Sequence, residues 1–345
     1  MRTALVMVVV ALAACTGGSG APAALVSPTA TASSSPSPVV TGGTGGWSIN
    51  CRLPVTWSVQ DGQTITSKAG FLSFPDRSLA EDPTAPAHSS FYDRAFSKWL
   101  PTWRVAVSPD GKRYAYTEGN AYQGTNGKVH VVDVATGADR VIYSGNAVYS
   151  VVDFNADGIY LTFAAPEGAP RGLFLESPSG GTPRTIVDTT MVAPAVGGGA
   201  AWGLDFNAAD PSPAPGGLEG PRNEVLRYDL RNGAATSWFY RPGADVGVIG
   251  FDSAGDPFVS AAITDPNGQS TFELWLVKSP TSAMKLPADP AAWLRLAAVD
   301  GYGVWFDGGS YGPLGQVWLY QQGQLAMVAH LPLNSLAVAG GCIPY

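Results

Sequence analysis

A hairpin pattern that recurs along the chain constrains the fold more than any other feature of the sequence. It is clearest at Trp103–Glu118, where an apolar segment, a Ser-Pro-Asp-Gly turn and a second alternating segment follow one another. Pro109 presets φ for a tight turn, and Gly111 can take the positive φ that such a turn needs. Similar first strands are expected at intervals of about 40 to 55 residues, the period of propeller blades. The expected first strands are Trp103–Ser108, Tyr149–Phe154, Val192–Gly197, Val246–Phe251, Leu294–Val299 and Ser335–Ala339.

The first five of these units continue in the same way, with a second strand and then another hairpin. The second hairpins are predicted at 129–143, 172–187, 224–239, 272–286 and 316–330. Four strands are therefore expected in each unit. The composition agrees, because 42 glycines and only 14% charged residues suit an all-β chain with many tight turns.

The sixth unit is divided between the two ends of the chain. Ser335–Ala339 has no strand after it, while the N-terminal region offers Leu53–Val59, Gly70–Pro75 and Tyr92–Leu100. One C-terminal strand and three N-terminal strands would complete a blade and leave no sheet edge open. The sequence therefore predicts an all-β, six-bladed β-propeller whose last blade is closed by the N-terminal strands and the C-terminal strand.

The hairpin SPDGKRYAYT resembles the PD40 (WD40-like) repeat of TolB-type β-propellers. The match is specific in this hairpin and diffuse in the other blades, where SPDG becomes NADG or SAGD. The resemblance implies a propeller and no particular activity. TolB itself acts with a peptidoglycan-associated lipoprotein in the periplasm and carries an extra N-terminal domain. In this chain, a tether is expected in that place.

The first 46 residues are expected to direct and tether the protein. Arg2 and the apolar run that ends at Leu12 have the length of a secretory signal. The sequence Leu-Ala-Ala-Cys that ends at Cys15 resembles the lipobox of bacterial lipoproteins. The resemblance implies a signal peptide over 1–15, lipidation of Cys15 and anchoring on the extracytoplasmic side of the cell membrane. An ordinary secretory signal is the alternative.

The segment that follows cannot form a core. Residues 16–46 carry no charge and are mainly Gly, Ser, Thr, Ala and Pro, so a disordered tether is expected there and the propeller at 47–345. Two cysteines remain, Cys51 and Cys342, one near each end of the folded part. Outside the cytoplasm, the simplest expectation is a disulfide between them, because it would replace the covalent turn that the chain ends lack.

Motifs that could carry chemistry are weak. Asp153–Gly158 opens like a calcium-binding loop, but Ala164 stands where a bidentate Glu belongs, so a hairpin turn is predicted. Gly308–Gly312 matches G-x-S-x-G, yet no Asp or Glu follows Ser310 to complete a hydrolase triad. No phosphate-binding fingerprint occurs, and the histidines lack metal spacing. No catalytic residue, metal or cofactor is predicted; the histidines are His88, His130 and His330.

Acidic residues at the exits of the second strands form the candidate binding surface. In a propeller these exits point to one face, and the loops there also carry Tyr122 and Tyr311. Such a face would attract a cationic partner or sugar hydroxyls. Ordinary solvated turn acids are the alternative. The acids are Asp61, Glu118, Glu167, Asp205, Asp265 and Asp307.

The expected function is a binding or scaffold domain of the cell envelope, a monomer that takes a protein or glycan ligand. A glycan hydrolase or lyase that uses carboxylates of this face is the alternative, and a structural spacer without a pocket is a third possibility. The net charge of −7 argues against a nucleic-acid partner. Tryptophans inside the expected strands are assigned to packing between blades: Trp57, Trp103, Trp202, Trp275, Trp305 and Trp318.

Overall fold

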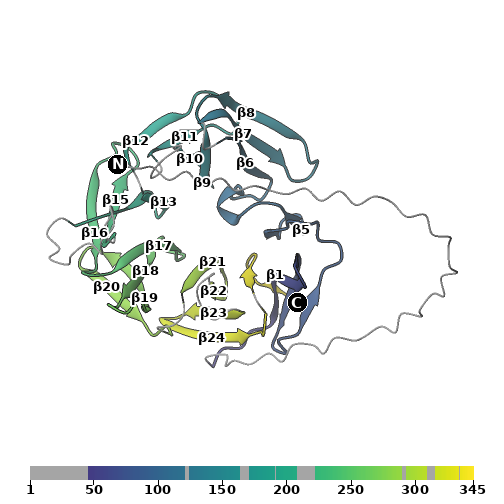
Figure 1. Ribbon diagram of the computed structural model, residues 1–345. Helices are drawn as coiled ribbons and strands as arrows, with labels where there is room; N and C mark the ends of the chain where they lie inside the picture. The colour runs from purple at the N-terminus through teal and green to yellow at the C-terminus, as the bar shows by residue number, and fades with distance from the viewer. Residues whose placement is uncertain are drawn as a thin grey trace, which may run out of the picture. The chain divides into compact units, whose positions relative to one another are not determined.

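The computed structural model describes residues 46–120, 124–163, 171–190, 192–207, 222–289, 293–308, 315–333 and 335–345. All of them belong to the second of two units, Met1–Ser37 and Pro38–Tyr345. The expected signal peptide and nearly all of the expected tether therefore lie outside the described residues. In the second unit, six of the seven described sheets surround a common axis as blades, which confirms the six-bladed propeller (Figure 1). None of the described residues forms a helix with the length and apolarity that crossing a membrane requires.

Four blades contain the expected four antiparallel strands. In each, the first strand lies nearest the axis, and neighbouring first strands contact one another around the ring (Figure 1). These blades are β9(Tyr149–Asn155), β10(Gly158–Phe163), β11(Arg171–Glu176) and β12(Arg184–Thr190); β13(Val192–Gly197), β14(Ala200–Asp205), β15(Glu224–Asp229) and β16(Ala235–Tyr240); β17(Asp245–Phe251), β18(Pro257–Thr264), β19(Ser270–Ser279) and β20(Ser282–Leu286); and β21(Leu294–Asp300), β22(Gly303–Gly308), β23(Gln316–Gln321) and β24(Gln324–His330).

The closing blade joins the two ends of the folded unit, as predicted. Its order is β25(Leu336–Val338), β1(Cys51–Asp61), β2(Thr64–Phe74) and β3(Leu79–Glu81), and β26(Ile343–Pro344) also pairs with β1. A disulfide links Cys51 to Cys342, with the Cα atoms 5.7 Å apart, and confirms the expected bond. The prediction of Tyr92–Leu100 as the outermost strand of this blade is wrong, because β3 takes that place.

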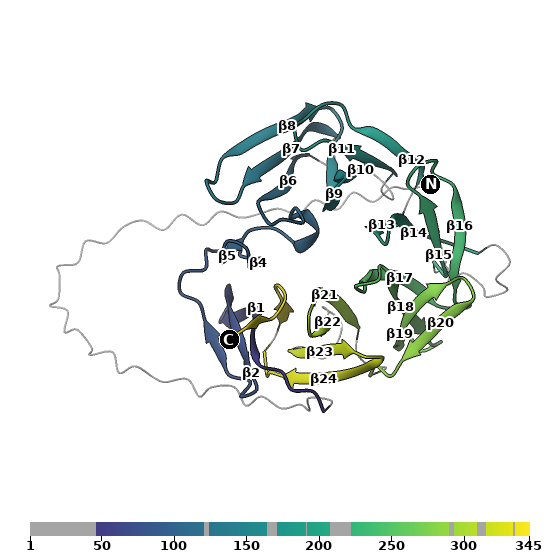
Figure 2. The same ribbon diagram turned by 180° about the vertical axis from the view of Figure 1, so that it is seen from behind.

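Residues 91–100 instead form a separate two-stranded hairpin, β4(Phe91–Asp93) and β5(Lys98–Leu100). Figure 2 shows this hairpin between the closing blade and β6. Tyr92 and Trp99 pack against the closing blade, while Leu100 packs on the other side with Val107. The hairpin therefore fills the junction between the last blade and the first.

The first blade has three regular strands, β6(Arg113–Asn120), β7(Thr125–Asp133) and β8(Asp139–Gly145). The prediction of a strand over Trp103–Ser108 is wrong, because Arg104–Ala106 forms a 3-10 helix, η1, and only the Val107–Tyr114 bridge remains of the inner strand. Apolar alternation suggested a strand, but Val105 is 47% exposed. The β4–β5 hairpin covers Val107 in place of an extended neighbour. The Ser-Pro-Asp-Gly turn itself is confirmed by the Gly111 N–H, which donates to the Ser108 carbonyl at 2.9 Å.

Large aromatic side chains pack within and between the blades. Trp202 and Trp305 are almost fully buried, and Phe258 contacts Phe306 of the next blade with ring centroids 5.2 Å apart. The expected packing role of the strand tryptophans is therefore confirmed at these positions. Trp103 is the exception, because it is 57% exposed and lies outside any strand.

An ion-pair network between two blades should make stability depend on acid pH. Arg241, which follows β16, donates to both carboxylate oxygens of Glu273 on β19 at 2.9 and 3.0 Å, and Lys285 donates at 2.8 Å. The Arg241 hydrogen bonds lower the pKa of Glu273 to about 2. Because the folded-state pKa lies below the unfolded value, this stabilisation is present above about pH 4.5 and is lost as the pH falls towards 2.

We expect Glu273→Gln to lower the free energy of unfolding by about 3 kcal/mol at pH 7 and by almost nothing near pH 2. Urea unfolding of both proteins across this pH range measures the difference. Glu81→Gln is the matched control, because its ion pair with Lys68 is solvent-exposed and should contribute less than about 1 kcal/mol. A difference for Glu273→Gln that does not change with pH would contradict the assignment.

Candidate functional site

A pocket of about 700 Å³ opens on the propeller face where the second strands end. Its position follows from Gly308, the last residue of β22, which pairs with Leu294 at the start of β21. The wall combines β1, β2, β17, β21, β22 and β25 with residues 88–90 and Trp103. The pocket therefore lies on the face that is predicted from the sequence to bind a partner, beside the joint between the two ends of the folded unit.

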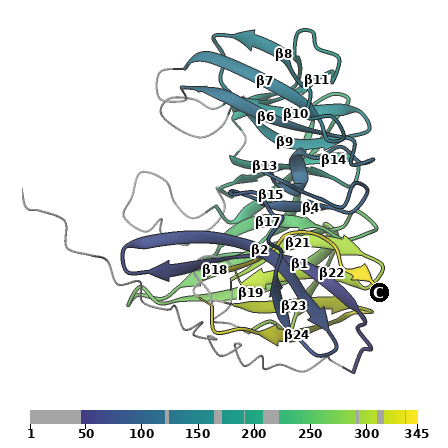
Figure 3. The same ribbon diagram turned by 90° about the vertical axis from the view of Figure 1, so that its right-hand side faces the viewer.

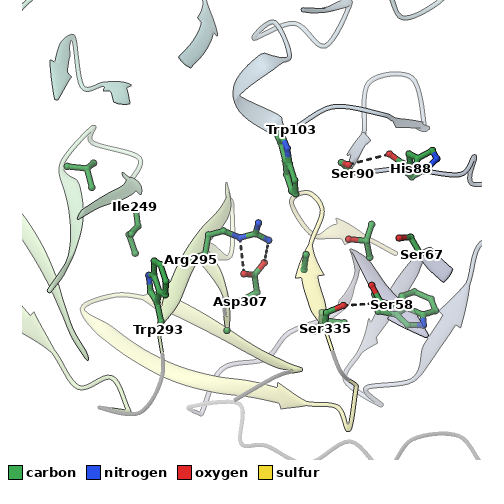
Figure 4. Close-up of a pocket in the computed structure, with 17 residues that line it drawn as sticks. Ser58, Ser67, His88, Ser90, Trp103, Ile249, Trp293, Arg295, Asp307 and Ser335 are labelled. Atoms are coloured by element: carbon green, nitrogen blue, oxygen red, sulfur yellow. Dashed lines mark hydrogen bonds and ion pairs between the residues drawn. The ribbon is translucent and has the colours of Figure 1, made fainter. Parts of the chain in front are cut away.

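An Arg–Asp pair occupies the centre of this pocket (Figure 4). Arg295 Nε donates to Asp307 Oδ1 at 3.0 Å and Nη2 donates to Oδ2 at 2.8 Å, across two residues in register on β21 and β22. The Val338 N–H also donates to Oδ2, at 2.8 Å. The Asp307 side chain is 1% exposed and that of Arg295 is 41% exposed, so the carboxylate anchors a guanidinium that reaches solvent.

Burial raises the pKa of Asp307, while the hydrogen bonds from Arg295 and Val338 oppose this shift. Arg295 still has hydrogen-bond donors for a ligand, because a guanidinium carries five N–H groups and the Nη1 group has no acceptor among the described residues. Since the Asp307 charge is adjacent, the pair presents directional donors with little net charge. Such donors suit neutral acceptors such as hydroxyl, ring and carbonyl oxygens.

Two tryptophans flank the Arg–Asp pair (Figure 4). The Arg295 guanidinium carbon lies 5.4 Å from the Trp103 ring centroid, in a cation–π contact. Trp293 stacks on Phe272, with centroids 6.1 Å apart and an angle of 14° between the rings. The exposed Trp103 indole is thus held by Arg295, and Trp293 is held by the neighbouring blade.

Hydroxyl groups cover the opposite wall. The β1–β2 hairpin projects from this face (Figure 3), because residues beyond Trp57 on β1 pair only with β2. The Ser58 N–H donates to Ser335 Oγ at 3.1 Å, and Ser90 Oγ donates to the His88 carbonyl at 3.3 Å. The pocket therefore combines an aromatic side with a polar side. The hydroxyl-bearing residues that line it are Thr56, Ser58, Ser67, Ser89, Ser90 and Ser335.

The five predicted acids within the described ranges do not form a carboxylate ring around this pocket. Asp61, Asp205 and Asp265 are exposed at strand ends, and Glu118 pairs with Lys128 at 3.3 Å. Asp265 accepts the Asn267 and Gln269 N–H groups, as a turn-forming acid does. Among the predicted acids that the structure describes, only Asp307 lines the pocket, where it is buried and paired rather than exposed on a rim. Glu167, Tyr122 and Tyr311 lie outside the described residues.

Trp103, Trp293 and Arg295 are site residues that were not predicted from the sequence. The sequence did indicate that Arg295 could be a site residue. It is a charged residue within an apolar first strand, and Asp307 lies opposite it in the second strand of the same hairpin. For Trp103 there was no such indication, because its assignment to a strand placed it in the core.

The other motifs add no further site within the described residues. Asn155 and Gly158 close the β9–β10 hairpin, which confirms the turn prediction for this segment. No group of three or more His, Cys, Asp or Glu side chains in the described ranges is arranged to hold a metal ion. Residues 309–312 of the G-x-S-x-G match lie outside those ranges.

No protein-family model and no curated protein matches the sequence. Among solved structures, a protein from Lactobacillus plantarum has a TM-score of 0.50 at 12% identity, and the match covers 83% of this chain and 99% of the other. A prolyl endopeptidase has a TM-score of 0.50 at 11% identity, and the match covers 86% of this chain but about half, 51%, of that enzyme. TolB from Acinetobacter baumannii has a TM-score of 0.47 at 14% identity, with coverage of 85% and 67%. At these identities the likeness concerns the fold alone.

Proposed function

We propose that this protein is a lipid-anchored, extracytoplasmic propeller that binds a neutral glycan of the cell envelope in the pocket between Trp103 and Ser335. The observation that carries the proposal is the exposed Trp103 indole, which lies against the anchored Arg295 guanidinium. Anchoring through Cys15 and the envelope location rest on the sequence of the first 46 residues.

A sugar ring suits this pocket on two counts. One face of a pyranose carries C–H bonds and can lie on an indole, while its hydroxyl and ring oxygens can accept from a guanidinium. The serine and threonine hydroxyls of the opposite wall can donate to or accept from the remaining sugar hydroxyls. A concave site of this kind also supports a binding module over a purely structural spacer.

A glycan hydrolase or lyase of the expected kind would need two convergent carboxylates whose pKa values differ. The described lining of the pocket supplies one, Asp307, and both of its oxygens already accept hydrogen bonds. The arrangement supports binding better than acid–base chemistry.

The test is a glycan array probed with the purified full-length chain, followed by titration of the glycans that bind. We expect Trp103→Ala to weaken binding at least tenfold, since truncating a tryptophan that anchors a partner typically costs about 2 kcal/mol or more, and about 1.4 kcal/mol is a factor of ten. Tyr345→Ala is the matched control, because Tyr345 is 68% exposed and does not line the pocket. Unchanged binding by Trp103→Ala, or no neutral glycan bound by the wild type, would overturn the proposal.

A further inference from the structure

A second, larger cavity of about 1160 Å³ lies along the propeller axis and adjoins the Trp103 pocket. Its wall is formed by the inner strands β9, β13, β17, β21 and β25, together with η1 and β4. A ligand held between Trp103 and Arg295 therefore lies next to this axial cavity. The residues that line both cavities are Ser90, Trp103, Val248, Ile249 and Arg295.

The wall of the axial cavity is mainly aliphatic. Val151 on β9, Ala195 on β13 and Leu296 on β21 line it, and each is partly exposed. None of the three lines the Trp103 pocket, where hydroxyl groups cover one wall. An apolar group along the axis would remove the remaining surface of these side chains from water, which is favourable. The axial cavity therefore suits an apolar body, whereas the Trp103 pocket suits a sugar.

The charged side chains of the axial cavity balance one another. Three arginines and three aspartates line it, so the lining has no net charge. Each of the acids accepts a hydrogen bond from within the chain, and two of the arginines donate one. An uncharged apolar body is therefore favoured over an ion of either sign. The charged residues are Asp93, Arg94, Arg104, Asp110, Asp153 and Arg295.

The combined size of the two cavities exceeds what a small sugar needs. Pockets for small ligands typically measure about 300–1000 Å³, and the Trp103 pocket of about 700 Å³ already lies in that range. The adjoining axial cavity therefore offers room for a second, chemically different part of the same ligand.

We propose that the glycan bound at Trp103 carries an aliphatic chain, so that the ligand is a neutral glycolipid. This inference rests on the proposed glycan binding and names the substrate class of that same site. The sugar lies on Trp103, where Arg295 donates to its oxygens, and the chain lies along the axis against the aliphatic wall. Each CH₂ group that this wall buries then adds to the affinity.

Calorimetric titration of the full-length protein with methyl, butyl and octyl β-glucosides, each below its micelle concentration, tests the proposal. The sugar is the same in all three, so a difference in affinity reports on the chain. Each buried CH₂ group strengthens binding by about fourfold. We therefore expect octyl glucoside to bind at least about 100-fold more tightly than methyl glucoside, with butyl glucoside between them.

Octanol is the control for the sugar, and it should bind at least about tenfold more weakly than octyl glucoside because it cannot stack on Trp103. Equal affinities for methyl and octyl glucoside would overturn the proposal. So would an octanol affinity equal to that of octyl glucoside, or no binding of octyl glucoside.

Val151→Asp tests whether the chain occupies the axial cavity. Because Val151 lines this cavity and not the Trp103 pocket, the variant should bind octyl glucoside at least about tenfold more weakly and methyl glucoside like the wild type. β9 already carries Asp153 two residues further on, so the strand accommodates an acid. Ala195→Phe fills part of the cavity from the next blade and should have the same effect.

Val141→Asp is the matched control for Val151→Asp. Val141 is 45% exposed and lines neither cavity, so this variant should change neither affinity. Methyl glucoside binding at the wild-type level shows that a variant has folded. Octyl glucoside affinity that stays at the wild-type level in both Val151→Asp and Ala195→Phe would contradict the placement of the chain.

Trp103→Ala separates a failure of this inference from a failure of the glycan site. It should weaken binding of both methyl and octyl glucoside, because both place the sugar on Trp103. If it does so while the wild type binds the two glucosides equally, the glycan site stands and the chain site is wrong. If octyl glucoside binds tightly and Trp103→Ala changes nothing, the sugar does not lie on Trp103 and both proposals fail.

Discussion

Replacing Cys51 and Cys342 together by alanine should lower the free energy of unfolding by about 5 kcal/mol. The disulfide closes a loop with a sequence separation of 291 residues, and the chain-entropy model assigns the largest stabilisation to the longest loops. The bond also lies where the structure needs it, because only short strands hold the C-terminal segment on β1. β25 pairs with β1 at three positions and β26 at two.

Urea unfolding of the wild type and the double variant measures this effect. The wild type treated with a reducing agent is the control, and it should lose a similar amount, because its buried thiols keep the packing of the two sites. A loss below about 1 kcal/mol in both would mean that strand pairing alone closes the ring, contrary to the prediction.

Asp307→Ala should destabilise the protein by about 3 kcal/mol and also weaken glycan binding at least tenfold. The substitution leaves the Val338 N–H without its acceptor in a buried position, and it removes the anchor that orients the Arg295 guanidinium. Arg295 itself can be hydrated because it is partly exposed, which limits the loss of stability. Thermal unfolding and titration with an array-selected glycan measure the two effects.

Asp205→Ala is the matched control for Asp307→Ala. Asp205 also ends the second strand of a blade, but its side chain is exposed, and among the described residues it accepts only the N–H of the next residue, Phe206, at 2.8 Å. We expect a change in unfolding free energy below about 0.5 kcal/mol and no change in glycan binding. If both variants behaved alike, the buried Arg–Asp pair would not be the functional part of this face.

Most of the architecture could be predicted from the sequence because it rests on local patterns. Period-2 alternation, Asp-Gly turns and the spacing of hairpins report on neighbouring residues, and these define the blades from Tyr149 to His330. The closing blade and the Cys51–Cys342 bond followed from counting units, because a ring with open ends would leave unpaired strand edges. The prediction failed at 91–108, where the β4–β5 hairpin and the 3-10 helix η1 replace regular strands of the blades. It failed because a local sequence pattern does not show which neighbouring element a segment packs against.

The composition of the binding face was decided only by the tertiary structure. The acids at the strand exits share a sequence position, yet Asp307 is buried by the closing strand β25 while Asp205 remains in solvent. Trp103 contacts Arg295, which lies about 190 residues further along the chain. This contact forms because Arg104–Ala106 is the 3-10 helix η1 and not the strand that the sequence predicts. The sequence by itself determined the propeller, its closure and the face of interest. Which side chains on that face can hold a ligand was decided by their burial and by contacts between residues far apart in the sequence. Both burial and these contacts depend on how the blades pack around one axis.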